Sequence, residues 1–145
     1  MQAINVLLVE DNAGDAVLIR QVLADIATPV HLHIARDGEQ AVLMLTDSDF
    51  KPDLILLDLN IPRISGLALL DRWNSLDIPV VVFSSSMNEL EQKRALALGA
   101  RDFVAKPTDI QAFIDVVTGS FTRGRGRMAV VQRPGTLTDS LAFAP

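Results

Sequence analysis

The stretch Asp53-Leu54-Ile55-Leu56-Leu57-Asp58-Leu59-Asn60-Ile61-Pro62 decides how this chain folds. Four consecutive apolar residues, at positions 54 to 57, end abruptly in the carboxylate of Asp58. An unbroken run of this kind, with a proline on either side, is typical of a short strand buried on both faces. Such strands belong to parallel sheets between helical layers, so we expect Asp58 at the carboxyl end of the strand, where these sheets bind ligands.

The overall composition restricts the class of protein. The chain has 145 residues and a net charge of -5, which disfavours a general affinity for nucleic acid or anionic membranes. This length predicts one domain. Because cysteine is absent, disulfides and thiolate metal sites are excluded and a reducing, cytoplasmic location is favoured. No apolar run approaches the roughly 20 residues of a membrane helix, and we expect no signal peptide.

Strand and helix patterns alternate along the rest of the chain. The strand patterns occupy residues 4–9, 30–35, 54–57, 78–83 and 102–105. The helical patterns occupy about 14–26, 39–46, 66–76, 88–98 and, from a cap at Thr108 or Asp109, about 110–121. The strand at 30–35 alternates apolar and polar residues, which indicates a half-exposed edge strand. Five such units with right-handed crossovers predict an α/β fold: a doubly wound five-stranded parallel sheet with helices on both faces.

Some local predictions concern single residues. In the first helix, the apolar positions with helical spacing are Val17, Leu18, Val22 and Ile26, and Asp11 or Asn12 is the expected cap. His31 and His33 lie two apart on the predicted edge strand, as a metal pair or, as we expect, as two solvent-facing side chains. Trp73 has the helical spacing of a core residue, and Gly99 is expected in the left-handed conformation after its helix.

Polar residues end every buried strand of the pattern. They are Glu10-Asp11, Asp58, Ser84 and Lys106, and in a parallel sheet these ends meet on one side. Polar residues often follow strands, which would explain any one of them alone. All four together favour a shared cleft, because clustered carboxylates repel by roughly 1 to 4 kcal/mol per pair at ~4 Å and require a cation. A site built from oxygen ligands suits Mg²⁺.

This combination of side chains indicates phosphoryl chemistry. With a divalent cation present, Asp58 could act as a nucleophile on a phosphoryl donor. Mg²⁺ and Lys106 would stabilise the charge of the transferring group, and Ser84 could donate a hydrogen bond to a phosphoryl oxygen. The sequence places no obvious base for hydrolysis beside them, so a long-lived acyl phosphate is expected.

Five segments jointly resemble the receiver domain of bacterial two-component response regulators. They are Val9-Glu10-Asp11-Asn12, Leu57-Asp58-Leu59-Asn60-Ile61-Pro62 with Gly66, Ser84 after Pro79-Val80-Val81-Val82-Phe83, Gly99-Ala100, and Lys106-Pro107. The resemblance covers about residues 4–121 and implies the flavodoxin-like strand order 2-1-3-4-5. The first two segments are most similar to the stand-alone receivers that are paired with phytochrome-type histidine kinases.

The resemblance also implies roles for individual residues. The implied Mg²⁺ ligands are Glu10, Asp11, Asp58 and the backbone carbonyl of Asn60. Asp58 would accept a phosphoryl group from a sensor histidine kinase, and Ser84 and Lys106 would contact that group. Ser84 and Phe103 would form the conformational switch, although Phe103 lacks the hydroxyl of the commoner tyrosine. The Lys106-Pro107 bond would be a cis peptide.

We therefore predict a receiver domain at residues 1–121 and a C-terminal extension, a linker or dimerisation arm, at 122–145. Three arginines among glycines, Arg123, Arg125 and Arg127, indicate a solvated linker more than a nucleic-acid contact. The apolar run 128–131 could pack back on its own domain. Because exposed apolar strands tend to find partners, we instead expect exchange with a second subunit and a homodimer.

The predicted function is a single-domain, cytoplasmic response regulator that is not an enzyme and that switches protein-protein interactions through a Mg²⁺-dependent phosphorelay. An aspartate-nucleophile phosphohydrolase is one alternative, but such enzymes typically carry a second aspartate two residues after the nucleophile, where Asn60 stands. A receiver-type transcription regulator is another, and we recognise no helix-turn-helix pattern after the receiver segment.

Overall fold

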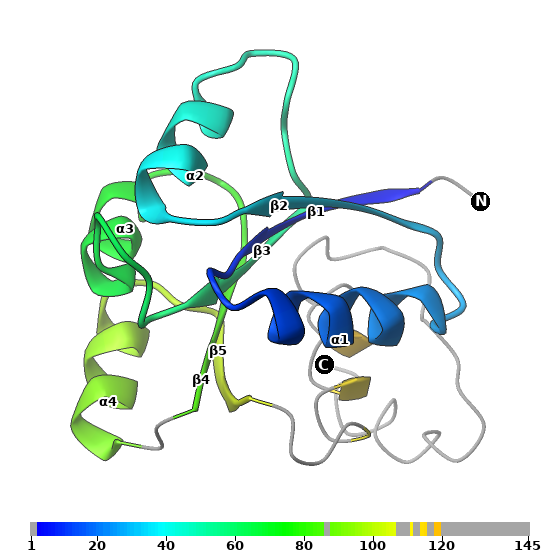
Figure 1. Cartoon of the computed structure of the whole chain (residues 1–145). Coiled ribbons are helices and arrows are strands. Elements are labelled where there is room, and N and C mark those ends of the chain that lie inside the picture. The colour runs from blue at the N-terminus through cyan, green and yellow to red at the C-terminus, as the bar shows by residue number, and fades with distance from the viewer. Residues whose placement is uncertain (1–2, 86–87, 107–110, 112–113, 116–117, 120–145) are drawn as a thin grey trace.

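The computed structural model describes residues 3–85, 88–106, 111, 114–115 and 118–119. The elements bounded within these residues are β1 (Ile4–Val9), α1 (Ala13–Ala24), β2 (Val30–Ala35), α2 (Gly38–Leu45), β3 (Leu54–Asp58), α3 (Gly66–Trp73), β4 (Val80–Ser84), α4 (Glu89–Ala97) and β5 (Asp102–Ala105). All five strands pair in parallel, in the order β2-β1-β3-β4-β5 (Figure 1). The predicted fold class and strand order are therefore confirmed.

The central strand β3 buries both of its faces, as its unbroken apolar run predicts. Leu54 and Leu56 join the core on the α1 side, whereas Ile55 and Leu57 join the core formed with α2, α3 and α4. Figure 1 shows α1 on one side of the sheet and these three helices on the other. Because side chains alternate along a strand, Asp58 follows the register of Leu54 and Leu56, and it is only 2% exposed.

The first helix differs from its prediction in its end and in its buried stripe. Asn12, one of the two expected caps, accepts a hydrogen bond from Asp15 N, and the helix ends at Ala24 instead of Ile26. Val17 is 54% exposed, so its expected place on the buried stripe was wrong. The buried residues are Ala16, Ile19, Val22 and Leu23. The small Ala16, which a search for large apolar residues passes over, sets the face of the helix that meets the sheet.

Other boundaries shift by one to three residues. The helix α3 ends at Trp73, after which Leu76 is 41% exposed, and β4 begins at Val80 instead of Ile78. Pro79 precedes β4 and has no N–H to donate to a neighbouring strand. Trp73 is buried, and Gly99 has a φ of 108° after α4, so both of these predictions are confirmed.

The strand β2 lies at the edge of the sheet, as its alternation predicts. His31 is exposed, but His33 is half-buried and meets the ring of Phe50 edge-on, with centroids 4.8 Å apart. The expectation that both histidines face solvent therefore holds for His31 and fails for His33. A long loop between α2 and β3 brings Phe50 to this position, and local alternation carries no information about such a distant neighbour.

Residues 111, 114–115 and 118–119 are helical, in agreement with the predicted last helix, and Ile114 joins the core on the α1 side. Its expected cap at Thr108 or Asp109, the Lys106-Pro107 peptide and the extension at 122–145 lie outside the described residues. Over the part of the chain that the structure describes, no helix combines the length and apolar character needed to cross a membrane.

Candidate functional site

The carboxyl ends of four neighbouring strands carry the predicted site residues. Glu10 and Asp11 follow β1, Asp58 is the last residue of β3, Ser84 is the last residue of β4, and Lys106 follows β5. The parallel pairing aligns these ends: Val9 pairs with Leu57, Asp58 with Phe83, and Ser84 with Ala105. The sheet therefore delivers all five side chains to one edge.

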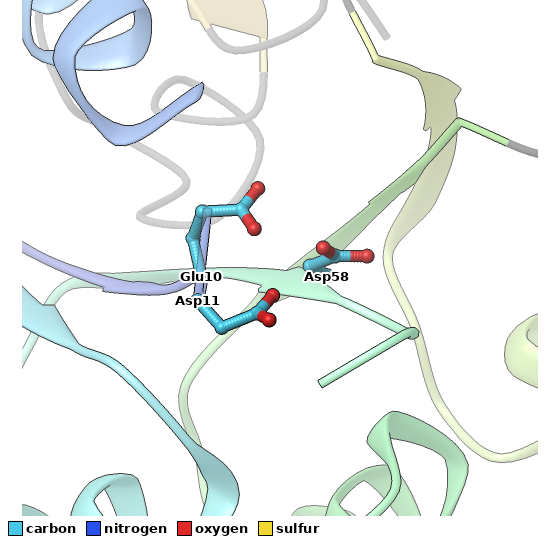
Figure 2. Close-up of side chains that lie close together, drawn as sticks. All are labelled: Glu10, Asp11 and Asp58. Atoms are coloured by element: carbon cyan, nitrogen blue, oxygen red, sulfur yellow. The ribbon is translucent and has the colours of Figure 1, made fainter. Parts of the chain in front are cut away.

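Three carboxylates form an acidic cluster at this edge, which we define as Glu10, Asp11 and Asp58. One oxygen from each lies within 4.8 Å of the others, and the close-up in Figure 2 shows the side chains of Glu10 and Asp11 extending towards Asp58. Glu10 is 0% exposed and Asp58 is 2% exposed, whereas Asp11 is exposed. The buried members repel each other where water screens them poorly, so the cluster requires positive charge.

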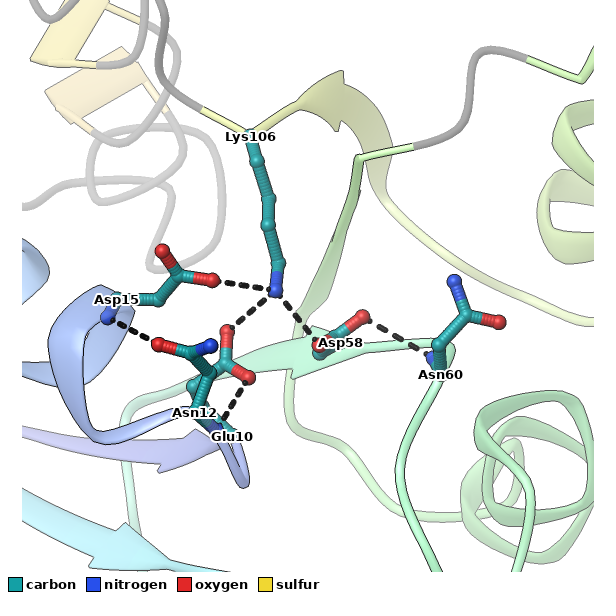
Figure 3. A network of polar contacts seen from close by, with 6 residues as sticks. All are labelled: Glu10, Asn12, Asp15, Asp58, Asn60 and Lys106. Carbon is teal, nitrogen blue, oxygen red and sulfur yellow. Dashed lines mark hydrogen bonds and ion pairs between the residues drawn. The ribbon is translucent and has the colours of Figure 1, made fainter.

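Lys106 supplies one such charge from the neighbouring strand end. Its Nζ lies 2.9 Å from Glu10 Oε1, 2.9 Å from Asp58 Oδ2 and 2.8 Å from Asp15 Oδ2, as the dashed lines in Figure 3 indicate. The side chain of Lys106 is 17% exposed, so the ammonium is largely withdrawn from solvent. It also lies 5.7 Å from the centre of the Phe83 ring, within range of a cation–π contact.

Backbone N–H groups orient the two buried carboxylates. Asn12 N donates to Glu10 Oε2 at 3.1 Å, and Asn60 N donates to Asp58 Oδ1 at 3.0 Å (Figure 3). Each donor comes from the turn that immediately follows the strand. The side chains are thereby held in fixed orientations, which leaves one oxygen of each carboxylate directed at Lys106.

Burial shifts the ionisation of this site. Desolvation raises the pKa of Glu10 from 4.5 to about 7, against the contact with Lys106 and the Asn12 N–H, with a smaller contribution from the charge of Asp58. Burial also disfavours the charged form of Lys106, but its contacts with Asp15, Glu10 and Asp58 outweigh this and raise its pKa above the ordinary 10.5. The ammonium therefore stays charged, while Glu10 remains incompletely compensated.

The donor set fits a hard divalent cation. Glu10 Oε1 is buried and lies 2.9 Å from Lys106 Nζ, but Asp58 and Asp15 contact the same ammonium, so the positive charge is shared among three carboxylates. A buried carboxylate that shares one ammonium with two other carboxylates is expected to gain a further positive partner. The acidic cluster offers oxygen atoms alone, and Mg²⁺ binds through one or two carboxylates while it keeps several waters. The residues present are thus compatible with such an ion.

The other predicted residues occupy positions close to the cluster. Ser84 is fully buried, and its backbone carbonyl accepts a hydrogen bond from Lys106 N at 2.8 Å. The Asn60 backbone is held beside Asp58 by the hydrogen bond described above. Phe103 is 7% exposed and packs in the core on the α2, α3 and α4 side. The roles assigned to these residues by resemblance remain predictions.

Asp15 is a site residue that the sequence reasoning missed. Asp15 lies in the first turn of α1 and is not a member of the acidic cluster. Its Oδ2 nevertheless lies 2.8 Å from Lys106 Nζ, as close as the oxygens of Glu10 and Asp58 do. A signal for it was available in the sequence. Asn12-Ala13-Gly14-Asp15 has the spacing of a capping motif, in which an acidic residue stands three positions after the capping residue. Because the capping residue Asn12 directly follows Glu10-Asp11, this motif predicts that Asp15 lies close to the acidic residues.

The loop after Asp58 is held closed by a glycine. Gly66 N donates to Leu59 O at 3.2 Å, and a Cβ built on Gly66 would lie 2.6 Å from Leu59 Cα. A contact that short with backbone excludes any larger residue without movement of the chain. Gly66, which was part of the family-like motif, therefore fixes the path of the loop that carries Asn60.

Comparison with known proteins agrees with the resemblance to receiver domains that the sequence indicates. A family model described as "Response regulator receiver domain" matches residues 6–118. A protein-glutamate methylesterase/protein-glutamine glutaminase of Geobacter sulfurreducens is 38% identical over 109 residues, which cover 74% of this chain and 29% of that protein. A corresponding protein of Nitrosomonas europaea is 34% identical over 100% of this chain and 43% of its own length. The chain thus spans less than half the length of these curated relatives.

Solved structures with the same fold cover most of the chain. The Mn²⁺-bound response regulator Rcp1 superposes with a TM-score of 0.71 and 30% identity, over 82% of this chain and 92% of its own. The phosphorylated cyanobacterial phytochrome response regulator RcpA superposes with a TM-score of 0.75 and 30% identity, over 91% of this chain and 100% of its own.

Proposed function

The chain belongs to the response regulator receiver domain family, and from this premise we propose that Asp58 is the phosphoacceptor of a two-component system. The observation that carries the proposal is the setting of Asp58 at the end of β3. Its side chain is 2% exposed, one oxygen accepts a hydrogen bond from Asn60 N, and the other lies 2.9 Å from Lys106 Nζ. A buried, oriented carboxylate beside an ammonium is suited to attack a dianionic phosphoryl group.

The proposed transfer takes the phosphoryl group from a phosphohistidine of a sensor kinase. A bond forms between an oxygen of Asp58 and phosphorus, and the phosphorus–nitrogen bond of the donor breaks. The electron pair of that bond stays on the histidine nitrogen, which then takes up a proton. The product on this chain is an acyl phosphate at Asp58, so the protein acts as a substrate for phosphorylation and not as an enzyme towards other molecules.

Mg²⁺ is the cofactor we propose. Glu10, Asp11 and Asp58 would hold it with their carboxylates, and Asn60 would contribute its backbone carbonyl. When bound, the ion neutralises the charge of the phosphoryl oxygens that approach the cluster. Support comes from the three carboxylate oxygens within 4.8 Å and from the buried Glu10, which shares the ammonium of Lys106 with Asp58 and Asp15.

Lys106 and Ser84 are proposed to recognise the phosphoryl group once it is attached. Lys106 would exchange its contact with Asp58 Oδ2 for one with a phosphoryl oxygen. Ser84, which β4 brings level with the end of β3, would donate its hydroxyl to another. Ser84 ends β4 and pairs with Ala105 of the neighbouring β5, the strand that also contains Phe103, so a movement of Ser84 towards the phosphoryl group would be transmitted to β5. Such a shift would alter the surface that a protein partner recognises.

The finer assignments extend this proposal. A phytochrome-type histidine kinase is a candidate donor because RcpA, a phytochrome response regulator, shares 30% identity over 91% of the chain. We propose a receiver domain at 1–121, an extension at 122–145 that serves as a dimerisation arm, and a cytoplasmic location. The methylesterase relatives align through less than half of their own length, so their enzymatic activity is not assigned to this chain.

Labelling tests the assignment of Asp58. Incubation with radioactive acetyl phosphate or with a phosphorylated kinase in Mg²⁺ should label the wild-type protein, and Asp58→Asn should remove the label. Asp71→Asn is the matched control because Asp71 is an exposed aspartate on α3, away from the acidic cluster. Equal labelling of the wild type and Asp58→Asn would refute the proposal. Steady turnover of a phosphate ester would favour a phosphohydrolase instead.

A further inference from the structure

We propose that Asp15 is a positioning residue that holds the ammonium of Lys106 beside the phosphoacceptor while the acidic cluster is engaged with a divalent cation. This inference rests on the proposed function, because it concerns how Lys106 is kept available for the phosphoryl group. The contact that carries it is the 2.8 Å hydrogen bond from Lys106 Nζ to Asp15 Oδ2 (Figure 3).

The partners of Lys106 divide into two kinds. Glu10 and Asp58 belong to the acidic cluster, so their oxygens are also the candidate ligands of a metal ion. Asp15 pairs with the same ammonium but has no place in that cluster. A metal ion bound by Glu10 and Asp58 therefore weakens two of the three contacts that Figure 3 shows for Lys106 and leaves the contact with Asp15 intact. Asp15 is therefore the partner of Lys106 for which the metal ion does not compete.

The position of Asp15 is fixed by the start of α1. Its backbone N–H donates to the side chain of Asn12 at 2.9 Å, and Asn12 N in turn donates to Glu10 Oε2 at 3.1 Å. The carboxylate of Asp15 is thereby tied to the same turn that orients Glu10. An ammonium held by Asp15 consequently keeps a defined distance from the cluster even when it releases Glu10 and Asp58.

Partial exposure suits this role. The side chain of Asp15 is 38% exposed and that of Lys106 is 17% exposed, so the pair lies at the rim of the site. A charged hydrogen bond at the rim of the site is strong enough to favour one position of the Lys106 ammonium, and it is weak enough for the ammonium to move when the phosphoryl group arrives. Without Asp15, the ammonium would either compete with the cation for Glu10 and Asp58 or turn away into solvent.

The first measurement reports on Lys106 directly. The full chain is acylated with acetic anhydride in saturating Mg²⁺ at fixed pH, and the labelling rate of Lys106 is compared by mass spectrometry with that of the exposed Lys93. Asp15→Ala should raise the relative rate of Lys106 by about three- to tenfold. The matched control is Glu91→Ala, because Glu91 also lies three residues after an asparagine cap, Asn88, but on α4.

The second measurement tests whether Asp15 acts through Lys106. Phosphorylation by acetyl phosphate is followed in saturating Mg²⁺. Asp15→Ala should lower the rate by about three- to tenfold in the wild-type background and should have no further effect in the Lys106→Ala background. Glu91→Ala should leave the rate unchanged in both backgrounds.

The inference is overturned if Asp15→Ala leaves the relative acylation of Lys106 unchanged, or if Glu91→Ala raises it equally. It is also overturned if Asp15→Ala lowers phosphorylation by the same factor with and without Lys106. Failure of the wild type to become phosphorylated would refute the proposed function, whereas the acylation of Lys106 would still decide the role of Asp15. The two failures are therefore distinguishable.

Discussion

The buried carboxyl of Glu10 predicts an unusual pH dependence of stability in the absence of divalent cations. Its pKa is raised from 4.5 to about 7, chiefly by burial, so the folded protein binds a proton at Glu10 more tightly than the unfolded chain does. Its stabilising contribution is fully present below about pH 4.5 and is lost as the pH rises through 7. The metal-free protein should therefore lose stability between about pH 5 and pH 8.

The magnitude follows from the size of the shift. A change of one pKa unit corresponds to about 1.4 kcal/mol, so a shift from 4.5 to about 7 corresponds to about 3 kcal/mol across this range as an upper value. Lys106 adds nothing to this slope, because its pKa is raised above 10.5 and the ammonium stays charged at every pH considered. For a domain of this size, about 3 kcal/mol is a substantial part of the total free energy of unfolding.

The assay is urea unfolding in EDTA at pH 5, 6, 7 and 8, for the wild type and for Glu10→Gln. The wild type should lose up to about 3 kcal/mol relative to Glu10→Gln as the pH rises, because glutamine cannot ionise. Saturating Mg²⁺ should restore the wild type at pH 8 and should have little effect on the variant. If the free energy of unfolding depends on pH in the same way for the wild type and for Glu10→Gln, burial does not disfavour the ionised form of Glu10, and the reasoning is refuted.

Three further outcomes follow from the structure. Lys106→Ala removes a cation that two buried carboxylates contact, so in EDTA at pH 8 it should lower the free energy of unfolding by about 2 to 4 kcal/mol, measured by urea titration, with a smaller loss in Mg²⁺. Gly66→Ala brings a Cβ within 2.6 Å of Leu59 Cα and should destabilise by about 1 to 3 kcal/mol. Gly14→Ala, whose Cβ would lie 3.3 Å from the side-chain oxygen of Asn12, should cost less, and equal thermal midpoints for the two variants would contradict this difference. Removal of residues 122–145 should convert a dimer into a monomer by light scattering, whereas an unchanged mass would exclude the arm.

The fold could be predicted because its strongest signals are local. The run from Leu54 to Leu57 is apolar on both faces, and this pattern has few explanations other than a strand between two helical layers. The edge strand was recognisable from alternation for the same reason. Where the prediction failed, a distant neighbour decided the outcome: Phe50 covers His33 across a loop, and the sheet selects the face of α1 that contains Ala16 and leaves Val17 exposed.

The sequence predicted which strand ends carry the candidate site residues, but it did not predict how their side chains are oriented. Parallel pairing brings the ends of β1, β3, β4 and β5 together, which is a property of topology and can be inferred from sequence. The direction of each side chain depends on the turn that follows its strand. The N–H groups of Asn12 and Asn60 set the directions of Glu10 and Asp58, and these contacts have no signature in the hydrophobic pattern.

Charge explains why the lysine lies where it does. The acidic cluster together with Asp15 contributes four carboxylates, and among the residues that the structure describes the ammonium of Lys106 is the one cation in contact with them, touching three. Burial is the main cause of the raised pKa of Glu10, the charge of Asp58 contributes less, and the contact with Lys106 offsets these effects only in part. An incoming phosphoryl group would add further negative charge at the same place. The proposed function therefore requires both a divalent cation and the ammonium of Lys106 at this edge of the sheet, and under our proposal the carboxylate of Asp15, which lies outside the acidic cluster, holds that ammonium while the cation is bound.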